Sequence, residues 1–259
     1  MFEGSRAHAG FAREARARRS SAAVLLSRQI YDDPEALAGR GEVSVLYTLY
    51  VTRNSAGMGA HAMLEELGAP FETEAIDTSK PRTPEYLAIN PTGRIPSLVE
   101  RDDAGQRVAV VFQSAAILCH LADRHPEAKF LGPVGGPARA RSLQWLWFMA
   151  EALQPAYLMH FHPDGFTADP SGQAAIDAKA TDLIDAAWAI VDGAIGAGSY
   201  MGGMAPDICD FYLLTFALWH KAHHRPLAAH PNLARALRGM TARPAVRRMM
   251  AASGKTLQL

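Results

Sequence analysis

Two stretches decide the fold of this chain: Asn90-Pro-Thr-Gly-Arg-Ile-Pro-Ser-Leu-Val99 and Phe112-Gln-Ser-Ala-Ala-Ile-Leu-Cys-His-Leu121. Pro96 has no amide hydrogen to give to a sheet ladder, so it must stand at the entrance of the strand that Ser97-Leu-Val99 predicts. Gly93 frees the preceding turn from the constraint of a Cβ atom. The bond before Pro96 is a candidate cis peptide, because cis bonds occur almost only before proline.

A hairpin and a helix start complete this region. After turn residues at 102–105, the run Val108-Ala-Val-Val-Phe112 predicts a second strand that pairs with the first. Ser114 stands where the free amides of a first helical turn need a partner, and Ile117 and Leu121 follow at helical spacing. A helix start of this kind favours an anionic ligand group.

The residues before these stretches predict alternating strands and a helix. Glu42 to Tyr50 is rich in β-branched and aromatic residues and predicts a strand, and Ala56 to Leu67 predicts a helix. Phe71 to Asp77 predicts a second strand, parallel to the first through a right-handed crossover. Thr83 to Ile89 has a cap residue followed by proline and predicts a short helix. The order βαβ, short helix, ββα is that of a thioredoxin-like domain, over residues 43–124.

The second half of the chain predicts helices alone. Residues 125–137 are rich in glycine and proline and form a linker to a helical bundle at 138–259. Asp207 and Asp210 form a capping pair in front of Phe211 to Trp219, an apolar stretch expected in the bundle core. The predicted fold class is α/β plus all-α.

Composition narrows the classes of function. The chain has 26 Lys and Arg against 26 Asp and Glu, so no net charge draws it to nucleic acid or to an acidic membrane. No apolar run approaches the roughly 18 residues that a spanning helix needs. Cys119 and Cys209 lie in apolar helical runs, which favours buried thiols and a reducing compartment. Residues 1–42 predict a disordered or partly helical extension, with a transit peptide or an upstream start codon as alternatives.

The motifs, in this order and spacing, resemble the glutathione-binding half of the glutathione S-transferase family. The pieces that carry the resemblance are Asn90 to Pro96, Gln113-Ser114 and Ala116 to Ala122, and the similarity extends from about residue 43 to about residue 250. The resemblance implies a cis bond before the proline. It also implies glutathione as co-substrate, a hydrophobic electrophile as second substrate, a role in detoxification, a cytoplasmic homodimer and no metal.

The same resemblance assigns parts of glutathione to residues. Ile95, before the cis Pro96, pairs its backbone with the cysteinyl part, and the pair Gln113 and Ser114 holds the γ-glutamyl end. Arg94 is a partner for the glycyl carboxylate, with an exposed surface arginine as the alternative reading.

Such an enzyme activates the thiol of its co-substrate. A free thiol has a pKa near about 8.5, and lowering it by roughly two units needs about 2.7 kcal/mol of preferential stabilisation of the anion. A hydroxyl donor plus a helix N-terminus can supply this. By resemblance, Ser55 matches the donor of serine-type classes and Tyr50 that of tyrosine-type classes, while Thr52 and Asn54 resemble part of a bacterial Thr-Pro-Asn motif. Each candidate also has a purely structural interpretation. Tyr50 can be an aromatic residue at the end of a strand, and Ser55 or Asn54 can be a helix cap.

Two observations bear on the reaction class. Cysteine-type classes need a cysteine where this chain has Ala56, so thiol-transferase chemistry is disfavoured. Gly57 and Gly59 flank the helix start and are expected to let a substrate approach closely. Two alternatives to a transferase stay open: a non-catalytic protein that binds glutathione or a hydrophobic ligand on the same fold, and a glutathione-dependent isomerase or disulfide reductase.

The second half offers candidates for a substrate pocket and for a metal. Tyr157, His160 and Phe161 lie late in the first helix of the second domain, which lines the electrophile pocket in the family; packing in the core is the competing reading. The pairs and triplets of histidines have spacings that could ligate zinc, but no cysteine or paired acid completes a four-ligand set. These histidines are His160, His162, His220, His223 and His224.

Overall fold

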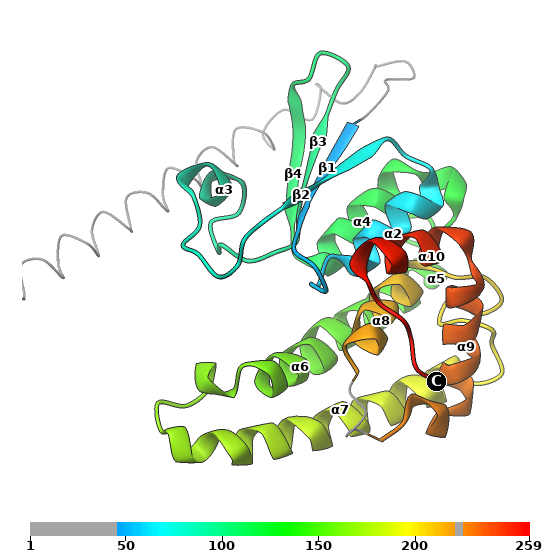
Figure 1. The fold of residues 1–259 in the computed structure, drawn as a ribbon. Helices are drawn as coiled ribbons and strands as arrows, with labels where there is room; N and C mark the ends of the chain where they lie inside the picture. Colours follow the sequence, from blue (N-terminus) through cyan, green and yellow to red (C-terminus); the bar gives the residue numbers. More distant parts are fainter. Residues whose placement is uncertain (1–45, 221–224) are drawn as a thin grey trace, which may run out of the picture. The chain divides into compact units, whose positions relative to one another are not determined.

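The computed structural model describes residues 46–220 and 225–259 (Figure 1). The predictions for residues 1–42 and for His223 and His224 lie outside these ranges. The described chain forms two compact units. The sheet unit contains the residues up to Thr52 together with Pro70–Phe112, and the helical unit contains Arg53–Ala69 together with the residues from Gln113 onward. These units are spatial groupings, and the predicted continuous domains at 43–124 and 138–259 stay predictions.

The sheet unit is a mixed four-stranded sheet in the order β2-β1-β3-β4. The strands are β1 (Leu46–Val51), β2 (Phe71–Ala75), β3 (Ser97–Arg101) and β4 (Arg107–Phe112). Strand β1 pairs in parallel with β2 and antiparallel with β3, and β3 and β4 form the predicted hairpin. The parallel pair needs a crossover because its two strands run in the same direction.

One face of the sheet is covered by the short helix α3 (Pro84–Ile89). Thr83 caps this helix, because its side chain accepts a hydrogen bond from the Tyr86 amide. Tyr86 and Ile89 of α3 pack with residues of three strands into a small buried cluster that also includes Tyr50, Val99 and Val110. The core of the sheet unit thus lies directly beneath α3.

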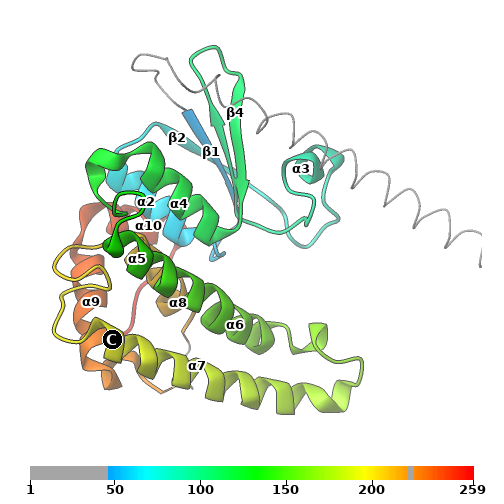
Figure 2. The same ribbon diagram turned by 180° about the vertical axis from the view of Figure 1, so that it is seen from behind.

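The helical unit contains the remaining helices. They are α2 (Met58–Leu67), α4 (Ser114–Arg124), α5 (Pro137–Phe148), a π-helical turn at Met149–Leu153, α6 (Gln154–Phe161), α7 (Gln173–Ile195), α8 (Ile208–Trp219), α9 (Pro231–Ala242) and α10 (Pro244–Ser253). Figure 2 shows α6 beside α7, two helices that contact each other along their length. The element order confirms the predicted class, a thioredoxin-like βαβ, short helix, ββα sequence followed by helices.

Helix α8 is the buried centre of the helical unit. All twelve of its residues are buried, including Phe211 and Phe216. Its start is the predicted capping box: the Asp207 carboxylate accepts the Cys209 amide at 2.8 Å, and the Asp210 carboxylate accepts the Asp207 amide at 2.9 Å. Burial raises the pKa of both carboxyl groups, and that of Asp210 reaches about 7. The cap therefore places two acidic side chains inside the protein, held by backbone amides.

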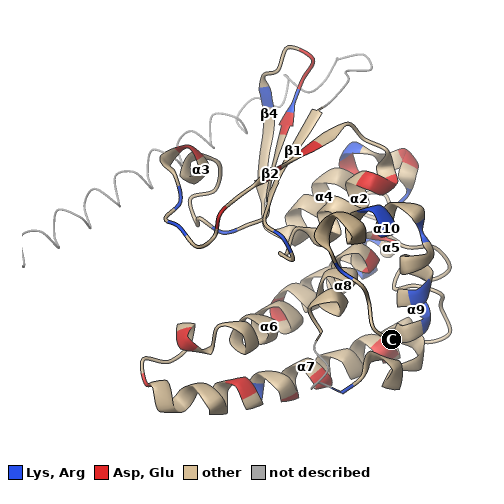
Figure 3. Cartoon of the chain, viewed as in Figure 1, with Lys and Arg blue, Asp and Glu red and all other residues tan. Residues whose placement is uncertain are grey.

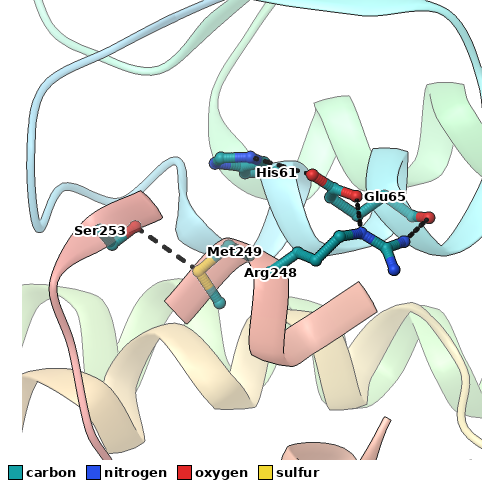
Figure 4. Close-up of polar contacts among 5 residues, drawn as sticks. All are labelled: His61, Glu65, Arg248, Met249 and Ser253. Atoms are coloured by element: carbon teal, nitrogen blue, oxygen red, sulfur yellow. Dashed lines mark hydrogen bonds and ion pairs between the residues drawn. The ribbon is translucent and has the colours of Figure 1, made fainter. Parts of the chain in front are cut away.

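Helix α10 packs on α2 through complementary charges (Figure 3). Arg248 donates to the carboxylate of Glu65 at 2.6 Å, and Arg243 forms an ion pair with Glu66. Figure 4 shows that Glu65 also lies next to His61 of the same helix, at 3.8 Å. Two ion pairs thus join α2 to α10 and to the residue that precedes it.

Candidate functional site

The turn before β3 is built around the backbone of Arg94. The Ile95–Pro96 bond is cis, as predicted. The Arg94 carbonyl accepts hydrogen bonds from the Tyr86 hydroxyl at 2.6 Å and from the Asn90 side-chain amide at 2.7 Å. Both donors come from α3 or its C-terminal end, so the short helix fixes the position of this turn. The Arg94 side chain is exposed, and its predicted pairing with the glycyl carboxylate stays a prediction.

Strand register brings several of the predicted residues to one end of the sheet. Ser97 pairs with Tyr50 of β1 on one side and with Phe112 of β4 on the other. Pro96 immediately precedes Ser97, and Gln113 immediately follows Phe112. The cis bond is therefore joined to β3 at Ser97, and Gln113 is joined to β4 at Phe112, the residue that pairs with Ser97.

Tyr50 is buried beneath α3. Its ring lies 5.7 Å from that of Tyr86, between centroids, and the side chain is 7% exposed. Burial, followed by the nearby carboxylate of Glu74, raises the pKa of the Tyr50 hydroxyl. Tyr50 also lines a cavity of about 360 Å³ in the sheet unit, together with Glu74 and Arg107. Its environment stabilises the neutral phenol and provides it with a carboxylate partner.

Ser55 stands at the start of α2, in the helical unit. Its side-chain oxygen accepts a hydrogen bond from the Gly57 amide at 3.3 Å, and its carbonyl accepts one from Met58 at 3.3 Å. A hydroxyl that accepts one hydrogen bond keeps its own hydrogen for donation. No acidic residue lies in the first turn of α2, so the positive end of the helix dipole is not neutralised there. Ser55 thus combines the two elements of thiolate stabilisation expected from the sequence, a hydroxyl and a helix N-terminus.

The residues around Ser55 have unlike environments. Asn54 is exposed and has φ of 64°, a left-handed conformation that asparagine tolerates better than most residues. Thr52 is half-buried at the end of β1 and belongs to the sheet unit. The roles of Ser55, Tyr50, Asn54 and Thr52 in thiol activation stay predictions.

The Gln113-Ser114 pair begins α4. Gln113 has φ of 75° and is exposed, whereas Ser114 is buried and donates its hydroxyl to the Ala56 carbonyl at 3.0 Å. Gln113 is one of the described non-glycine residues with positive φ. Within the helical unit, Ser114 is therefore bonded to the residue that follows Ser55.

Gly59 does not serve substrate access as predicted. Its amide donates to the Thr215 hydroxyl at 3.0 Å, and a Cβ added to it would lie 2.5 Å from the Phe211 carbonyl oxygen. Both neighbours belong to α8. The missing side chain lets the backbones of α2 and α8 approach each other, so this glycine is required for helix packing.

The three predicted substrate-pocket residues are in different surroundings. Tyr157 is fully buried, and its hydroxyl accepts from the Trp188 indole at 3.2 Å and contacts His220 at 3.1 Å. This arrangement supports the packing alternative for Tyr157. The Nδ1 atom of His160 lies 2.5 Å from a carboxylate oxygen of Asp177. Phe161 is half-buried and stacks on Tyr157, and its role, like that of His160, stays a prediction.

The described residues contain neither a metal-binding cluster nor a membrane-spanning helix. Among residues 46–220 and 225–259, no group of three or more His, Cys, Asp and Glu side chains could hold a metal ion. None of the helices in these ranges is long and apolar enough to cross a membrane.

Sequence reasoning missed Trp219, the last residue of α8. Its indole nitrogen donates to the Asn54 carbonyl at 2.8 Å, across 165 residues of chain. The sequence shows only that Trp219 closes an apolar helical run. No local pattern carries information about a partner so distant in the chain.

Comparisons with known proteins agree with this architecture. Residues 57–124 match the family model described as "Glutathione S-transferase, N-terminal domain". The glutathione S-transferase GstA of Escherichia coli O157:H7 is 26% identical over 80% of this chain and 98% of its own length, and glutathione S-transferase GST-4.5 of Xanthomonas campestris is 28% identical over 67% and 83%.

Solved structures show the same similarity along nearly the whole of their chains. A glutathione transferase from Methylococcus capsulatus is 28% identical with a TM-score of 0.66, over 80% of this chain and 98% of that one. A sphingomonad glutathione S-transferase, solved in complex with glutathione, is 25% identical with a TM-score of 0.68 over the same shares. The fold, the motifs and these relatives together support the glutathione S-transferase family for this chain.

Proposed function

We propose that this chain is a glutathione transferase that binds glutathione and uses Ser55 to hold its sulfur as the thiolate. The observation that carries the proposal is the position of Ser55, whose hydroxyl lies at the uncompensated N-terminus of α2 with its hydrogen available for donation. The sphingomonad relative solved with glutathione supports the choice of co-substrate.

The binding roles follow the family resemblance. The backbone of Ile95, before the cis Pro96, pairs with the cysteinyl part of glutathione, and Gln113 with Ser114 holds the γ-glutamyl end. The exposed side chain of Gln113 suits this role directly. Ser114 also has a structural role, because its hydroxyl donates a hydrogen bond to the carbonyl of Ala56. Arg94, exposed on the same turn as Ile95, binds the glycyl carboxylate.

The reaction then takes two steps. The thiol loses its proton to solvent, and the anion is stabilised by the Ser55 hydroxyl and the helix N-terminus. The sulfur lone pair next forms a bond to an electrophilic carbon of a hydrophobic second substrate, and the electron pair of the broken bond leaves with the leaving group. The assembly as a homodimer in the cytoplasm is proposed from the family resemblance alone.

Tyr50 is the competing donor, and its surroundings weigh against it. A group that stabilises a thiolate should be a good hydrogen-bond donor with a free hydrogen. The pKa of the Tyr50 hydroxyl is instead raised by burial and by the nearby carboxylate of Glu74, so Tyr50 holds its proton more tightly than a free phenol. Ser55 lacks such a partner among the hydrogen bonds that the structure gives it.

The test is conjugation of a chloronitrobenzene-type electrophile by matched variants. Ser55→Ala should lower kcat/KM by about 10- to 100-fold at neutral pH, as expected for a loss of up to about 2.7 kcal/mol. Ser171→Ala, which removes an exposed hydroxyl bound to Asp169, is the control and should keep wild-type activity. Activity that survives in Ser55→Ala but is lost in Tyr50→Phe would reverse the assignment.

A non-catalytic glutathione-holding protein is the second candidate. The observation that favours it is that the Ser55 hydroxyl already accepts a hydrogen bond from the Gly57 amide, an ordinary local turn before α2. In that case glutathione should bind but electrophiles should not be conjugated. The substitution Ser55→Ala should then change only the stability of the protein, and not the ionisation of bound glutathione.

A further inference from the structure

The segment that carries Ser55 is held by one face of α8. The Trp219 indole donates to the Asn54 carbonyl at 2.8 Å, and the Thr215 hydroxyl accepts from the Gly59 amide at 3.0 Å. Trp219 and Thr215 are four residues apart in the helix, so they lie on the same face, one above the other. Their two hydrogen bonds fix the segment on either side of Ser55.

The bond to Asn54 acts directly on Ser55. The Asn54 carbonyl and the Ser55 amide belong to one planar peptide group, so fixing the oxygen also fixes the plane that ends at the Ser55 Cα atom. Asn54 has φ of 64°, a left-handed conformation that asparagine tolerates, and the Trp219 bond to its carbonyl is one contact that holds it there. The orientation of the Ser55 side chain therefore depends on an indole from the far part of the sequence.

Trp219 is itself held rigidly. Its ring lies 5.9 Å from that of Tyr157, 5.8 Å from Phe161 and 5.7 Å from Phe216, each at a steep angle. Edge-to-face contacts on several sides restrict the rotation of an aromatic ring. Trp219 as a whole is 9% exposed, and its hydrogen bond to Asn54 is partly buried.

The residue before Asn54 is bound to a different helix. The Arg53 guanidinium donates to the Ser253 carbonyl at the C-terminal end of α10, at 3.3 Å. A cation at the negative end of a helix is favourable, but this contact is longer than the one from Trp219. Trp219 makes the shorter of the two attachments.

We propose that Trp219 is a positioning residue for thiolate formation: its indole hydrogen bond holds the Asn54–Ser55 peptide so that the Ser55 hydroxyl faces the bound sulfur. The inference rests on the proposed role of Ser55. It assigns to Trp219 an effect on the ionisation of bound glutathione that is separate from its contribution to packing.

The test measures the pKa of the bound thiol by the ultraviolet absorbance of the thiolate as pH is varied, with the dissociation constant of glutathione measured in parallel. Trp219→Phe should raise the bound-thiol pKa by about 0.5 to 1 unit, in keeping with the loss of one hydrogen bond, and change the dissociation constant of the peptide less than about threefold. Its kcat should fall by about 1.5- to 3-fold at pH about 7, in keeping with the smaller thiolate fraction, and approach the wild-type value at high pH.

Trp188→Phe is the matched control. Trp188 is also buried and also donates an indole hydrogen bond, but its partner is the Tyr157 hydroxyl. This variant should lose stability and leave the bound-thiol pKa unchanged. If Trp219→Phe does not fold, 3-benzothienylalanine at position 219 replaces only the N–H group by sulfur at nearly the same size.

The outcomes separate the two proposals. A wild-type protein that binds glutathione without ionising it overturns the proposed function, and the role of Trp219 with it. A wild-type protein that forms the thiolate, while Trp219→Phe or the benzothienyl variant forms it with the same pKa, leaves the proposed function intact and overturns the positioning role alone.

Discussion

Gly59→Ala tests how closely α2 must approach α8. The added Cβ would lie 2.5 Å from the Phe211 carbonyl oxygen and 3.0 Å from the Thr215 hydroxyl oxygen. The first of these atoms is backbone in a fully buried helix, so it cannot swing aside as the end of a flexible side chain would. Helix α2 must then move away from α8.

The magnitude follows from three terms. Overpacking of a dense core costs about 1–3 kcal/mol. Displacement of α2 also breaks the Gly59–Thr215 hydrogen bond, which contributes about 1 kcal/mol. Alanine regains up to about 1 kcal/mol of helix propensity. We therefore expect Gly59→Ala to lower the free energy of unfolding by about 2 kcal/mol, and the melting temperature by about 4–8 °C for a chain of this size.

The assay is urea denaturation of the purified variant beside Gly193→Ala. Gly193 lies within α7, and a Cβ added there meets no described atom within 4 Å. This control should therefore gain up to about 1 kcal/mol from helix propensity alone. The two identical substitutions should change stability in opposite directions. An unchanged or increased stability of Gly59→Ala would refute the close approach of the two helices.

Three further predictions concern single side chains. Asp210 accepts three backbone amides, so Asp210→Asn should lower the free energy of unfolding by about 2–4 kcal/mol in urea titrations. Burial and Asp207 raise the pKa of Asp210 to about 7, so the folded protein binds this proton more tightly than the unfolded chain. The wild type should therefore lose stability relative to Asp210→Asn as pH rises from about 4 to about 7. A difference in unfolding free energy that stays constant over this pH range would contradict the prediction. Tyr50→Phe should keep kcat/KM within about threefold of wild type, and a loss above tenfold would return Tyr50 to the mechanism. Burial raises the pKa of Cys119 to about 11 and that of Cys209 well above its usual value. A disulfide reagent at pH about 8 should therefore label both thiols at least 100-fold more slowly than it labels glutathione. Rapid labelling would show an exposed thiolate.

Local signals in the sequence were sufficient for the elements of the sheet unit and the cap of α8. Pro96 marks the entrance of β3, a proline after Thr83 marks the start of α3, and both are found there. The paired acids Asp207 and Asp210 form the predicted capping box. Each of these features is decided within a few residues of chain, which is why pattern and composition reveal it.

Features decided by distant contacts could not be predicted. The sequence shows a glycine at position 59, but its role depends on the backbone of Phe211, which no local pattern places beside it. Tyr157 was a candidate for the pocket and is buried against Trp188, since an aromatic on a helix has the same sequence signal in either setting. The bond from Trp219 to Asn54 belongs to the same class.

The central claim, that the protein binds glutathione as the thiolate with the help of Ser55, is tested most directly by calorimetric titration with glutathione in two buffers of different ionisation heat. At pH about 7.5, a shift of the thiol pKa from about 8.5 to about 6.5 predicts release of about 0.8 proton per glutathione bound. Ser55→Ala should bind the peptide and release markedly fewer protons. Binding by the wild-type protein with the same heat in both buffers would contradict the account.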